Sequence, residues 1–270
     1  PRVRRQRQMC IRDSFSIAWN DSLFMEGWEV KCVSDTRPPF YEITEVKPLN
    51  NATPHALFID LGASASDVWV VNDGYWGIAV TEGQRYNFQF YLFTEELKNT
   101  VVTAALLDRE EQIVVSKNFQ IERDGSWNHY EGTFTVDTTA NDLRFALLLP
   151  HKGKVYIDFV SMFPENTFCG HKNGLREDVA GMLRDLRPDF VRWPGGCIVE
   201  GLTMDNRIKW KETIGDIVKR PGEYNLWGYR STYGFGYHEF LQFCEDIDAD
   251  GMFVCNAGMS CLFRNGDYWE

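Results

Sequence analysis

The chain has 270 residues, enough for about two domains, and its formal net charge is −11 at pH 7. This acidic balance argues against a phosphate-backbone partner, so no nucleic acid is expected, whereas a neutral glycan meets no such electrostatic penalty. Hydrophobic residues make up 44% and aromatic residues 14% of the chain, which supplies ample core. No apolar run reaches the roughly 18 residues that a membrane span needs, so no membrane partner is predicted.

The first fourteen residues differ in charge from the rest. Residues 1–14 contain five Arg and one Asp, a net of +4, which leaves −15 for residues 15–270. A basic arm and the n-region of a signal peptide are two interpretations, but no apolar h-region follows Arg12. The string from Arg5 to Ser14 resembles translated sequencing-adapter read-through. We therefore expect residues 1–14 to be an artefact or disordered, with the natural N-terminus missing.

Residues 15–164 have the pattern of a β-sandwich of the jelly-roll or galactose-binding-like kind. Phe88, Phe90 and Leu92 alternate with polar or amphipathic residues, the period of a half-buried strand. Turn signals separate β-rich runs about 10–15 residues apart, and no helix of ten residues is predicted here. The expected strands are His55–Leu61, Val68–Val71, Arg85–Thr94, Val101–Asp108, Ile113–Ile121, Tyr130–Val136, Leu143–Leu149 and Val155–Met162.

After residue 165 the pattern changes to alternating helix and strand. The first helix is predicted over Arg176–Leu186, before Pro188, and the second over Tyr237–Asp246. Each carries apolar residues at helical spacing, which predicts one buried face. These residues are Val179, Met182, Leu183 and Leu186 in the first helix, and Phe240, Leu241 and Cys244 in the second.

Phe190–Arg192 is predicted to be a strand. Gly251–Asn256 is predicted to be a second strand, apolar for most of its length as buried parallel strands are. Residues 165–270 would then form about two of the eight units of a (β/α)8 barrel, an incomplete TIM barrel. The stretch from Glu200 to Gly236 would be a loop over the active face. We expect the chain to be a fragment that is truncated at both ends.

A polar, Gly-rich turn follows the first of these strands. The run is Arg192-Trp193-Pro194-Gly195-Gly196-Cys197. Its two glycines allow a sharp turn and a close approach to a ligand. Arg192 would lie at the carboxyl end of its strand, which is where barrel enzymes have their active-site residues.

Motifs around this run resemble the α-L-arabinofuranosidases of glycoside hydrolase family 51. They cover about a hundred residues in the family's order, and the upstream sandwich resembles the carbohydrate-binding-type insertion of some branches. The matching motifs are Met162 to Phe168, Asn173 to Arg176, Arg192 to Cys197, Val199 to Gly201, Trp210 to Gly215, Arg220 to Gly222, Asn225 to Tyr229 and Val254 to Gly258.

The resemblance implies a retaining glycosidase that releases terminal α-L-arabinofuranose from hemicellulose or pectin side chains, without metal or organic cofactor. Such enzymes need two carboxyl groups about 5–5.5 Å apart. The family places its acid/base Glu after an Asn, and no Asn-Glu dipeptide occurs in the 270 residues. Both catalytic carboxylates are therefore expected beyond residue 270, and the chain alone should be inactive. Oligomerisation is possible, and a periplasmic or extracellular location is favoured while the compartment stays open.

The resemblance also assigns the residues that bind sugar. Arg192 would hold the nucleophilic carboxylate, Cys197 would contact the arabinofuranose ring, and Asn256 would add a polar contact. Trp193 and Trp227, with Tyr229, would line the subsites. In the sandwich, Trp69, Tyr75 and Trp76 flank a turn and are candidates for stacking on glycan.

Each of these residues also has a structural interpretation. Arg192 could form an ion pair, Cys197 could be a buried turn cysteine, Asn256 could cap a strand, and the aromatic rings could pack in cores. The sandwich could brace the domains rather than bind glycan. Two other functions stay open: a non-catalytic carbohydrate-binding module, and another barrel glycosidase such as a xylosidase or endoglucanase.

The seven cysteines, an odd number, show no Cys-x-x-Cys spacing. Cys32 and Cys169 could pair, but nothing in the sequence requires it. Cys244 and Cys255 are predicted to be buried thiols that act as small apolar residues. The histidine and cysteine positions lack the spacing of metal ligands, so no metal site is predicted.

Overall fold

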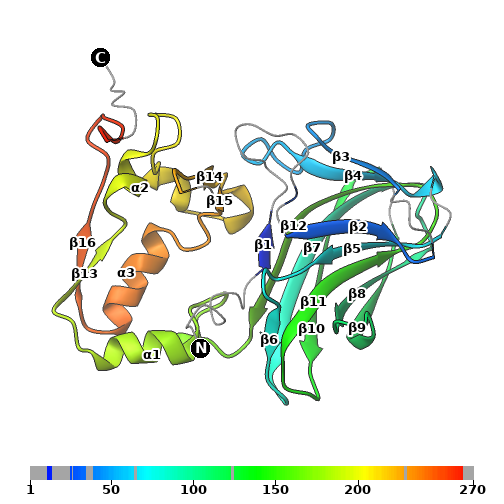
Figure 1. Cartoon of the computed structure of the whole chain (residues 1–270), viewed down its shortest axis with the longest axis horizontal. Helices are drawn as coiled ribbons and strands as arrows, with labels where there is room; N and C mark the ends of the chain where they lie inside the picture. The colour runs from blue at the N-terminus through cyan, green and yellow to red at the C-terminus, as the bar shows by residue number, and fades with distance from the viewer. Residues whose placement is uncertain are drawn as a thin grey trace.

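The computed structural model describes residues 11–13, 25, 27–34, 39–63, 66–122, 125–227 and 230–263. Residues 1–10 and 14 of the predicted arm, and Tyr229, lie outside the described residues. Figure 1 shows a large body of strands on the right and a smaller body with helices on the left. Within the described ranges, no helix is both long enough and apolar enough to cross a membrane.

The larger body consists of two antiparallel sheets. The first has the order β10 (Trp127–Thr135), β7 (Arg85–Glu95), β12 (Lys154–Pro164), β4 (Ala56–Asp60) and β3 (Phe40–Thr44), with β1 (Ile11–Asp13) also paired to β12. The second has the order β2 (Trp28–Cys32), β5 (Val68–Asn72), β11 (Ala140–Leu149), β8 (Val101–Leu107) and β9 (Ile113–Gln120), with β6 (Ile78–Val80) on β11. One short 3-10 turn, η2 (Leu61–Ala63), follows β4.

The sandwich core lies between these sheets and confirms the predicted alternation. Phe88, Phe90 and Leu92 of β7 all point inward and are buried. Phe88 stacks on Phe134 of β10 with 4.1 Å between ring centroids, and it also meets Phe145 from the opposite sheet. The short strands β2, β3 and β6 were not predicted. β6 has only three residues, but Trp28, Val30 and Cys32 of β2 alternate with charged residues, so the sequence does carry a strand period there.

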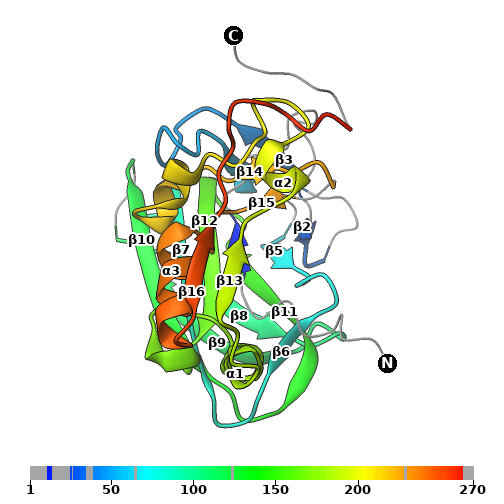
Figure 2. The same ribbon diagram turned by 90° about the vertical axis from the view of Figure 1, so that its left-hand side faces the viewer.

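The smaller body follows β12. Its elements are η3 (Phe168–Gly170), α1 (Glu177–Asp185), β13 (Phe190–Trp193), α2 (Cys197–Glu200), η4 (Trp210–Thr213), η5 (Ile217–Lys219), β14 (Glu223–Tyr224), β15 (Arg230–Ser231), α3 (Tyr237–Asp246) and β16 (Asp250–Phe253). β13 and β16 are parallel neighbours, and Arg192 lies opposite Met252. In Figure 2 both arrows run away from α1 and towards the end where α2, β14 and β15 lie.

Helix α3 packs on one face of this strand pair. Tyr237, Phe240 and Cys244 are buried, and Trp193 and Val191 of β13 pack against them. The prediction that Leu241 shares this buried face is wrong, because Leu241 is half exposed. Phe243 is buried instead, against Phe168 and Ala180.

Helix α1 begins and ends within one residue of its predicted bounds, but its predicted apolar face is not buried. Met182 and Leu186 are 70% and 74% exposed, and Val179 and Leu183 are exposed as well. Ala180 makes the buried contact of this helix instead. The periodicity therefore identified an apolar face that no described residue covers.

Candidate active site

Arg192 lies on the face of β13 that points away from the helices. Its neighbours Val191 and Trp193 pack towards α3, so Arg192 alternates to the opposite, exposed side. Gly195 has φ of +141°, and a Cβ placed there would lie 2.5 Å from a terminal nitrogen of Arg192. The positive φ favours glycine at this position, and the exposed end of the Arg192 side chain lies beside it.

Asn256 ties the loop after β16 to the loop after β13. Its Nδ2 donates to the carbonyl oxygens of Val199 at 3.1 Å and Met259 at 2.8 Å. Its Oδ1 accepts from the N–H of Gly258 at 2.7 Å. Both amide donors are thus used by the backbone, so only a remaining lone pair of Oδ1 is left for a ligand.

Cys197 begins the short helix α2 and lies in a cluster that the sequence did not predict. The Sγ atoms of Cys197 and Cys261 and a carboxylate oxygen of Glu200 all lie within 4.8 Å of one another. Cys261 is 1% exposed, and its backbone N–H donates to the carbonyl of Gly201 at 3.0 Å. The hydrogen bond with Cys197, burial and Glu200 together raise the pKa of the Cys261 thiol.

The other cysteines differ in part from their predictions. Cys32 and Cys169 are both free, so the possible pair is not formed. Cys244 is buried as predicted, but Cys255 is exposed. The prediction of a buried strand over Gly251–Asn256 is wrong as well, because β16 ends at Phe253 and its four residues are all exposed. No described residue covers this strand on its outer side, so a thiol just beyond it is exposed too.

The structure places the two predicted barrel tryptophans differently. Trp193 stacks on Phe240 with 5.6 Å between centroids and also meets Tyr237 and Phe235 edge-on. These contacts favour the core-packing interpretation for Trp193. Trp227 is exposed, and its backbone N–H donates to Oδ1 of Asn225 at 2.9 Å.

The three sandwich aromatics do not share one environment. Tyr75 and Trp76 are 55% and 56% exposed, and their ring centroids lie 6.3 Å apart in the turn between β5 and β6. Trp69 lies on the outer face of β5, against a small apolar cluster and under Nζ of Lys31. Tyr75 and Trp76 thus lie together in the turn, whereas Trp69 packs against other side chains of the sandwich.

Four glutamates of the smaller body occupy helix, 3-10 turn or short-strand positions. Glu200 ends α2, Glu212 lies in η4, Glu223 lies in the two-residue strand β14, and Glu239 lies in the first turn of α3. None of them follows an Asn at a strand end. That none of them is the family's acid/base residue stays a prediction.

Glu239 is held by a bidentate ion pair. Arg220 donates to its two oxygens at 2.8 Å and 3.0 Å, and the N–H of Gly236 adds a bond of 2.8 Å. Burial alone would raise the pKa of Glu239, but the bonds from Arg220 and Gly236 outweigh burial and lower it. Arg220 also donates to the carbonyl oxygens of Gly215 and Tyr233.

Glu223 is a buried carboxyl group that sequence reasoning missed. The hydroxyl of Tyr233 donates to its Oε2 at 2.7 Å, while Oε1 is buried and has no hydrogen-bond partner among the described residues. Burial raises the pKa of Glu223 to about 7, despite the opposing bond from Tyr233. No local pattern around Glu223 signals this burial, since β14 is only two residues long.

Replacing Glu223 by glutamine is expected to flatten the dependence of stability on pH. The folded-state pKa lies above the ordinary 4.5, so the protonated carboxyl stabilises the fold below about pH 4.5 and this contribution disappears as pH rises through about 7. The amide of the Glu223→Gln variant stays neutral, so at about pH 8 the variant should be more stable by on the order of 2 kcal/mol.

The measurement is the melting temperature of both proteins between about pH 5 and pH 8. Glu245→Gln, which removes an exposed carboxylate of α3, is the matched control and should follow the wild type. Parallel curves for wild type and Glu223→Gln would show that Glu223 keeps an ordinary pKa in the folded chain.

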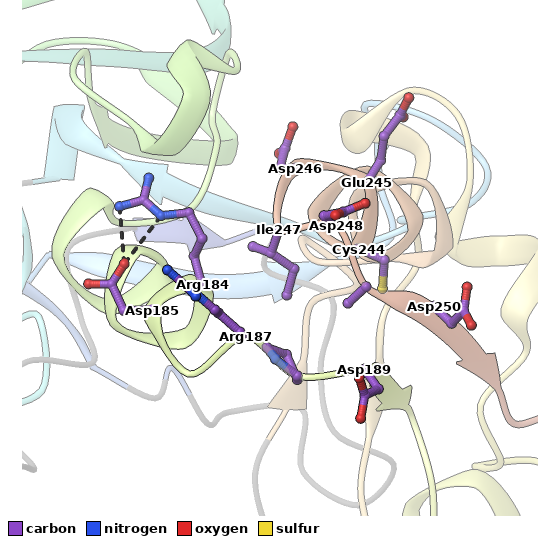
Figure 3. Close-up of a pocket in the computed structure, with 12 residues that line it drawn as sticks. Arg184, Asp185, Arg187, Asp189, Cys244, Glu245, Asp246, Ile247, Asp248 and Asp250 are labelled. Atoms are coloured by element: carbon purple, nitrogen blue, oxygen red, sulfur yellow. Dashed lines mark hydrogen bonds and ion pairs between the residues drawn. The ribbon is translucent and has the colours of Figure 1, made fainter.

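A concave region lined by acidic residues lies at the opposite end of the strand pair. Figure 3 shows Asp189 and Asp250 at the starts of β13 and β16, with Asp246 and Asp248 from the end of α3 and Arg184 paired to Asp185. This region lies away from the carboxyl ends of β13 and β16, where Arg192, Cys197 and Asn256 lie.

Two family profiles match separate parts of the chain. Residues 61–153 match a carbohydrate binding domain, and residues 182–266 match the alpha-L-arabinofuranosidase 1 domain. The first match lies within the sandwich and the second covers β13, α2, α3 and β16.

Curated relatives and a solved structure agree with these profiles. An extracellular exo-alpha-L-arabinofuranosidase of Streptomyces chartreusis is 35% identical over 204 residues, which is 71% of this chain and 24% of the relative. Alpha-L-arabinofuranosidase 1 of Arabidopsis thaliana is 35% identical over 201 residues, 74% of this chain and 29% of the relative. The arabinose-bound MgGH51 α-L-arabinofuranosidase superposes with a TM-score of 0.83 at 26% identity, covering 95% of this chain and 42% of that one.

The chain thus spans about a quarter to a third of the length of these curated relatives. The predicted resemblance is confirmed by matches that cover both bodies of the structure. Together these matches support a fragment that is related to the α-L-arabinofuranosidases of glycoside hydrolase family 51.

Proposed function

We propose that this chain is part of a retaining glycosidase that releases terminal α-L-arabinofuranose from hemicellulose or pectin side chains. The observation that carries the proposal is the superposition of 95% of the chain on an arabinose-bound relative. The curated relatives, whose names specify α-L-arabinofuranosidase activity, support the same reaction.

In this proposal residues 15–164 are a carbohydrate-binding-type sandwich, and residues 165–270 open a (β/α)8 barrel. The parallel pair β13 and β16, with α3 between them in sequence, supports the barrel because it is one strand–helix–strand unit. Exposed Phe190 and Met252 on this pair, and Met182 and Leu186 on α1, are apolar surfaces that further barrel units would cover.

The proposed glycone pocket lies at the carboxyl ends of β13 and β16. Arg192 would hold the nucleophilic carboxylate by charge-assisted hydrogen bonds, which also keep such a group ionised. Cys197 would contact the sugar ring, and Trp227 would line a subsite. Asn256 would mainly position the two loops, since its amide donors are already used.

The catalytic carboxylates would lie beyond residue 270, so the 270-residue chain should not turn over substrate. The test compares this chain with the full-length reading frame on aryl α-L-arabinofuranoside and aryl xyloside. We expect hydrolysis of the arabinofuranoside by the full-length protein alone. Turnover by the 270-residue chain above a buffer control would show that the catalytic pair lies within it, and a preference for xyloside would favour another barrel glycosidase.

A second function, glycan binding by the sandwich, is favoured by the exposed pair Tyr75 and Trp76. Two adjacent rings at a turn offer an apolar platform for a sugar face. Trp76→Ala should weaken retention of the chain on immobilised arabinoxylan by about tenfold, or ~1.4 kcal/mol.

Affinity electrophoresis with and without arabinoxylan measures this change. Phe40→Ala is the matched control, because Phe40 is also an exposed aromatic residue of the sandwich but lies on β3. Equal retention of wild type and Trp76→Ala would contradict glycan binding at this turn. It would favour the alternative, in which the sandwich braces the domains.

A further inference from the structure

We propose that Cys197, Glu200 and Cys261 form a binding site for a thiophilic divalent cation such as Zn²⁺. The inference concerns a different property from the proposed glycosidase activity but shares Cys197 with it, because a cation on this thiol would replace the sugar contact proposed for it. It concerns residues that lie in two different loops and that spacing in the sequence did not connect, since Cys261 is far along the chain from Cys197 and Glu200.

The distances fit a tetrahedral cation. The three donor atoms lie within 4.8 Å of one another. Thiolate sulfurs bound at about 2.3 Å to a tetrahedral zinc lie about 3.8 Å apart, so a small contraction of the cluster completes the geometry. Two thiolates and a carboxylate are also donors that zinc commonly takes in proteins.

The backbone supports the three donors independently of a cation. Cys197 and Glu200 are three residues apart in α2, which places both on one side of a helical turn. The loop that carries Cys261 is fixed to the end of α2 by the bond from Cys261 N–H to the carbonyl of Gly201. Asn256 adds a second connection through Val199.

A cation at this site would join the loop after β13 to the loop after β16. These are the loops that border the proposed glycone pocket, so the cation would reduce the freedom of both loops. Three protein donors leave a fourth position for water or another ligand. The Glu200 carboxylate favours a cation site over a Cys197–Cys261 disulfide, because a disulfide bond joins the two sulfurs alone and involves no third donor.

The test uses Co²⁺ as a spectroscopic probe of the reduced, metal-free chain. We expect one bound equivalent with thiolate-to-cobalt charge-transfer absorption and the visible bands of a tetrahedral ion, and we expect Zn²⁺ to displace it. Cys197→Ser and Cys261→Ser should each weaken cobalt binding by about tenfold or more and reduce the charge-transfer band. Glu200→Gln keeps both thiolates, so it should retain the band while binding more weakly.

Cys169→Ser is the matched control, because Cys169 is an exposed cysteine outside the cluster, and its cobalt binding should equal that of the wild type. Circular dichroism establishes that each variant is folded. The proposal is overturned if the wild type binds no stoichiometric cobalt, or if binding survives unchanged in folded Cys197→Ser and Cys261→Ser. A Cys197–Cys261 disulfide found by mass spectrometry in chain purified without reductant would likewise overturn it in favour of a redox pair.

Discussion

Arg220→Ala is expected to destabilise the smaller body by about 3–5 kcal/mol. Arg220 is buried and gives a bidentate pair to Glu239 together with bonds to the carbonyls of Gly215 and Tyr233. Its removal leaves the Glu239 carboxylate half-buried with only the N–H of Gly236 as a remaining partner from this network. The carbonyl oxygens lose their donor at the same time, and unmet buried acceptors add to the cost.

The position of α3 depends on this network. Gly236 caps the helix so close to the preceding chain that a Cβ there would lie 2.1 Å from the carbonyl oxygen of Thr213. The pair between Arg220 and Glu239 fixes the loop that ends at η5 against this first helical turn. Loss of Arg220 should therefore free the amino end of α3 first.

Urea denaturation followed by tryptophan fluorescence, with hydrogen exchange of α3, measures the effect. Arg184→Ala is the matched control, since Arg184 forms an exposed pair with Asp185 and should change stability by less than about 1 kcal/mol. Arg220→Lys keeps the charge but loses the bidentate geometry, and we expect an intermediate loss. Equal stability of Arg220→Ala and Arg184→Ala would contradict the role assigned to the network.

The elements were predictable where a local period determines them. The alternation at Phe88, Phe90 and Leu92 predicted strand β7, and the helical spacing between Tyr237 and Asp246 predicted α3 with its observed bounds. Both signals come from neighbours in sequence, so they need no knowledge of the partner surface.

Burial was less predictable, because it depends on what covers a face. The apolar positions Met182 and Leu186 lie on a correctly predicted helix, yet both are exposed. Leu241 follows the buried Phe240 by one residue, a step of about 100° around the helix, and therefore points towards solvent while Phe243 is buried.

Which residues bind the sugar stays a prediction, but their places in the fold can be compared with the sequence. Arg192 and Cys197 lie at and after the end of β13, and Asn256 follows the parallel neighbour β16 and donates to the carbonyl of Val199. The grouping of Cys261 with Cys197, and the burial of Glu223, depend on how loops far apart in sequence fold onto each other. The spacing of residues along the sequence does not predict such contacts.

Arg192→Ala, made in the full-length enzyme, is expected to lower kcat by about 10²–10³-fold with little change in KM. Arg192 lies exposed at the carboxyl end of β13, with its guanidinium beside Gly195. In the proposed mechanism it supports the nucleophilic carboxylate, whose charge changes during the reaction. Removal of that support raises the barrier to chemistry more than it weakens the binding of the substrate.

Cys197→Ala provides the contrast, because this residue is proposed to contact the sugar itself. It should act mainly on KM, at a cost of about 1–2 kcal/mol for one lost hydrogen bond or close contact. Both variants are assayed with a chelator present, so that any cation at Cys197 does not enter the comparison. Arg187→Lys, at the opposite end of β13, and Arg192→Lys form a matched pair, and only Arg192→Lys should lower kcat. The reverse pattern, with KM raised by Arg192→Ala and kcat lowered by Cys197→Ala, would exchange the two roles, because each parameter reports a different stage of the reaction.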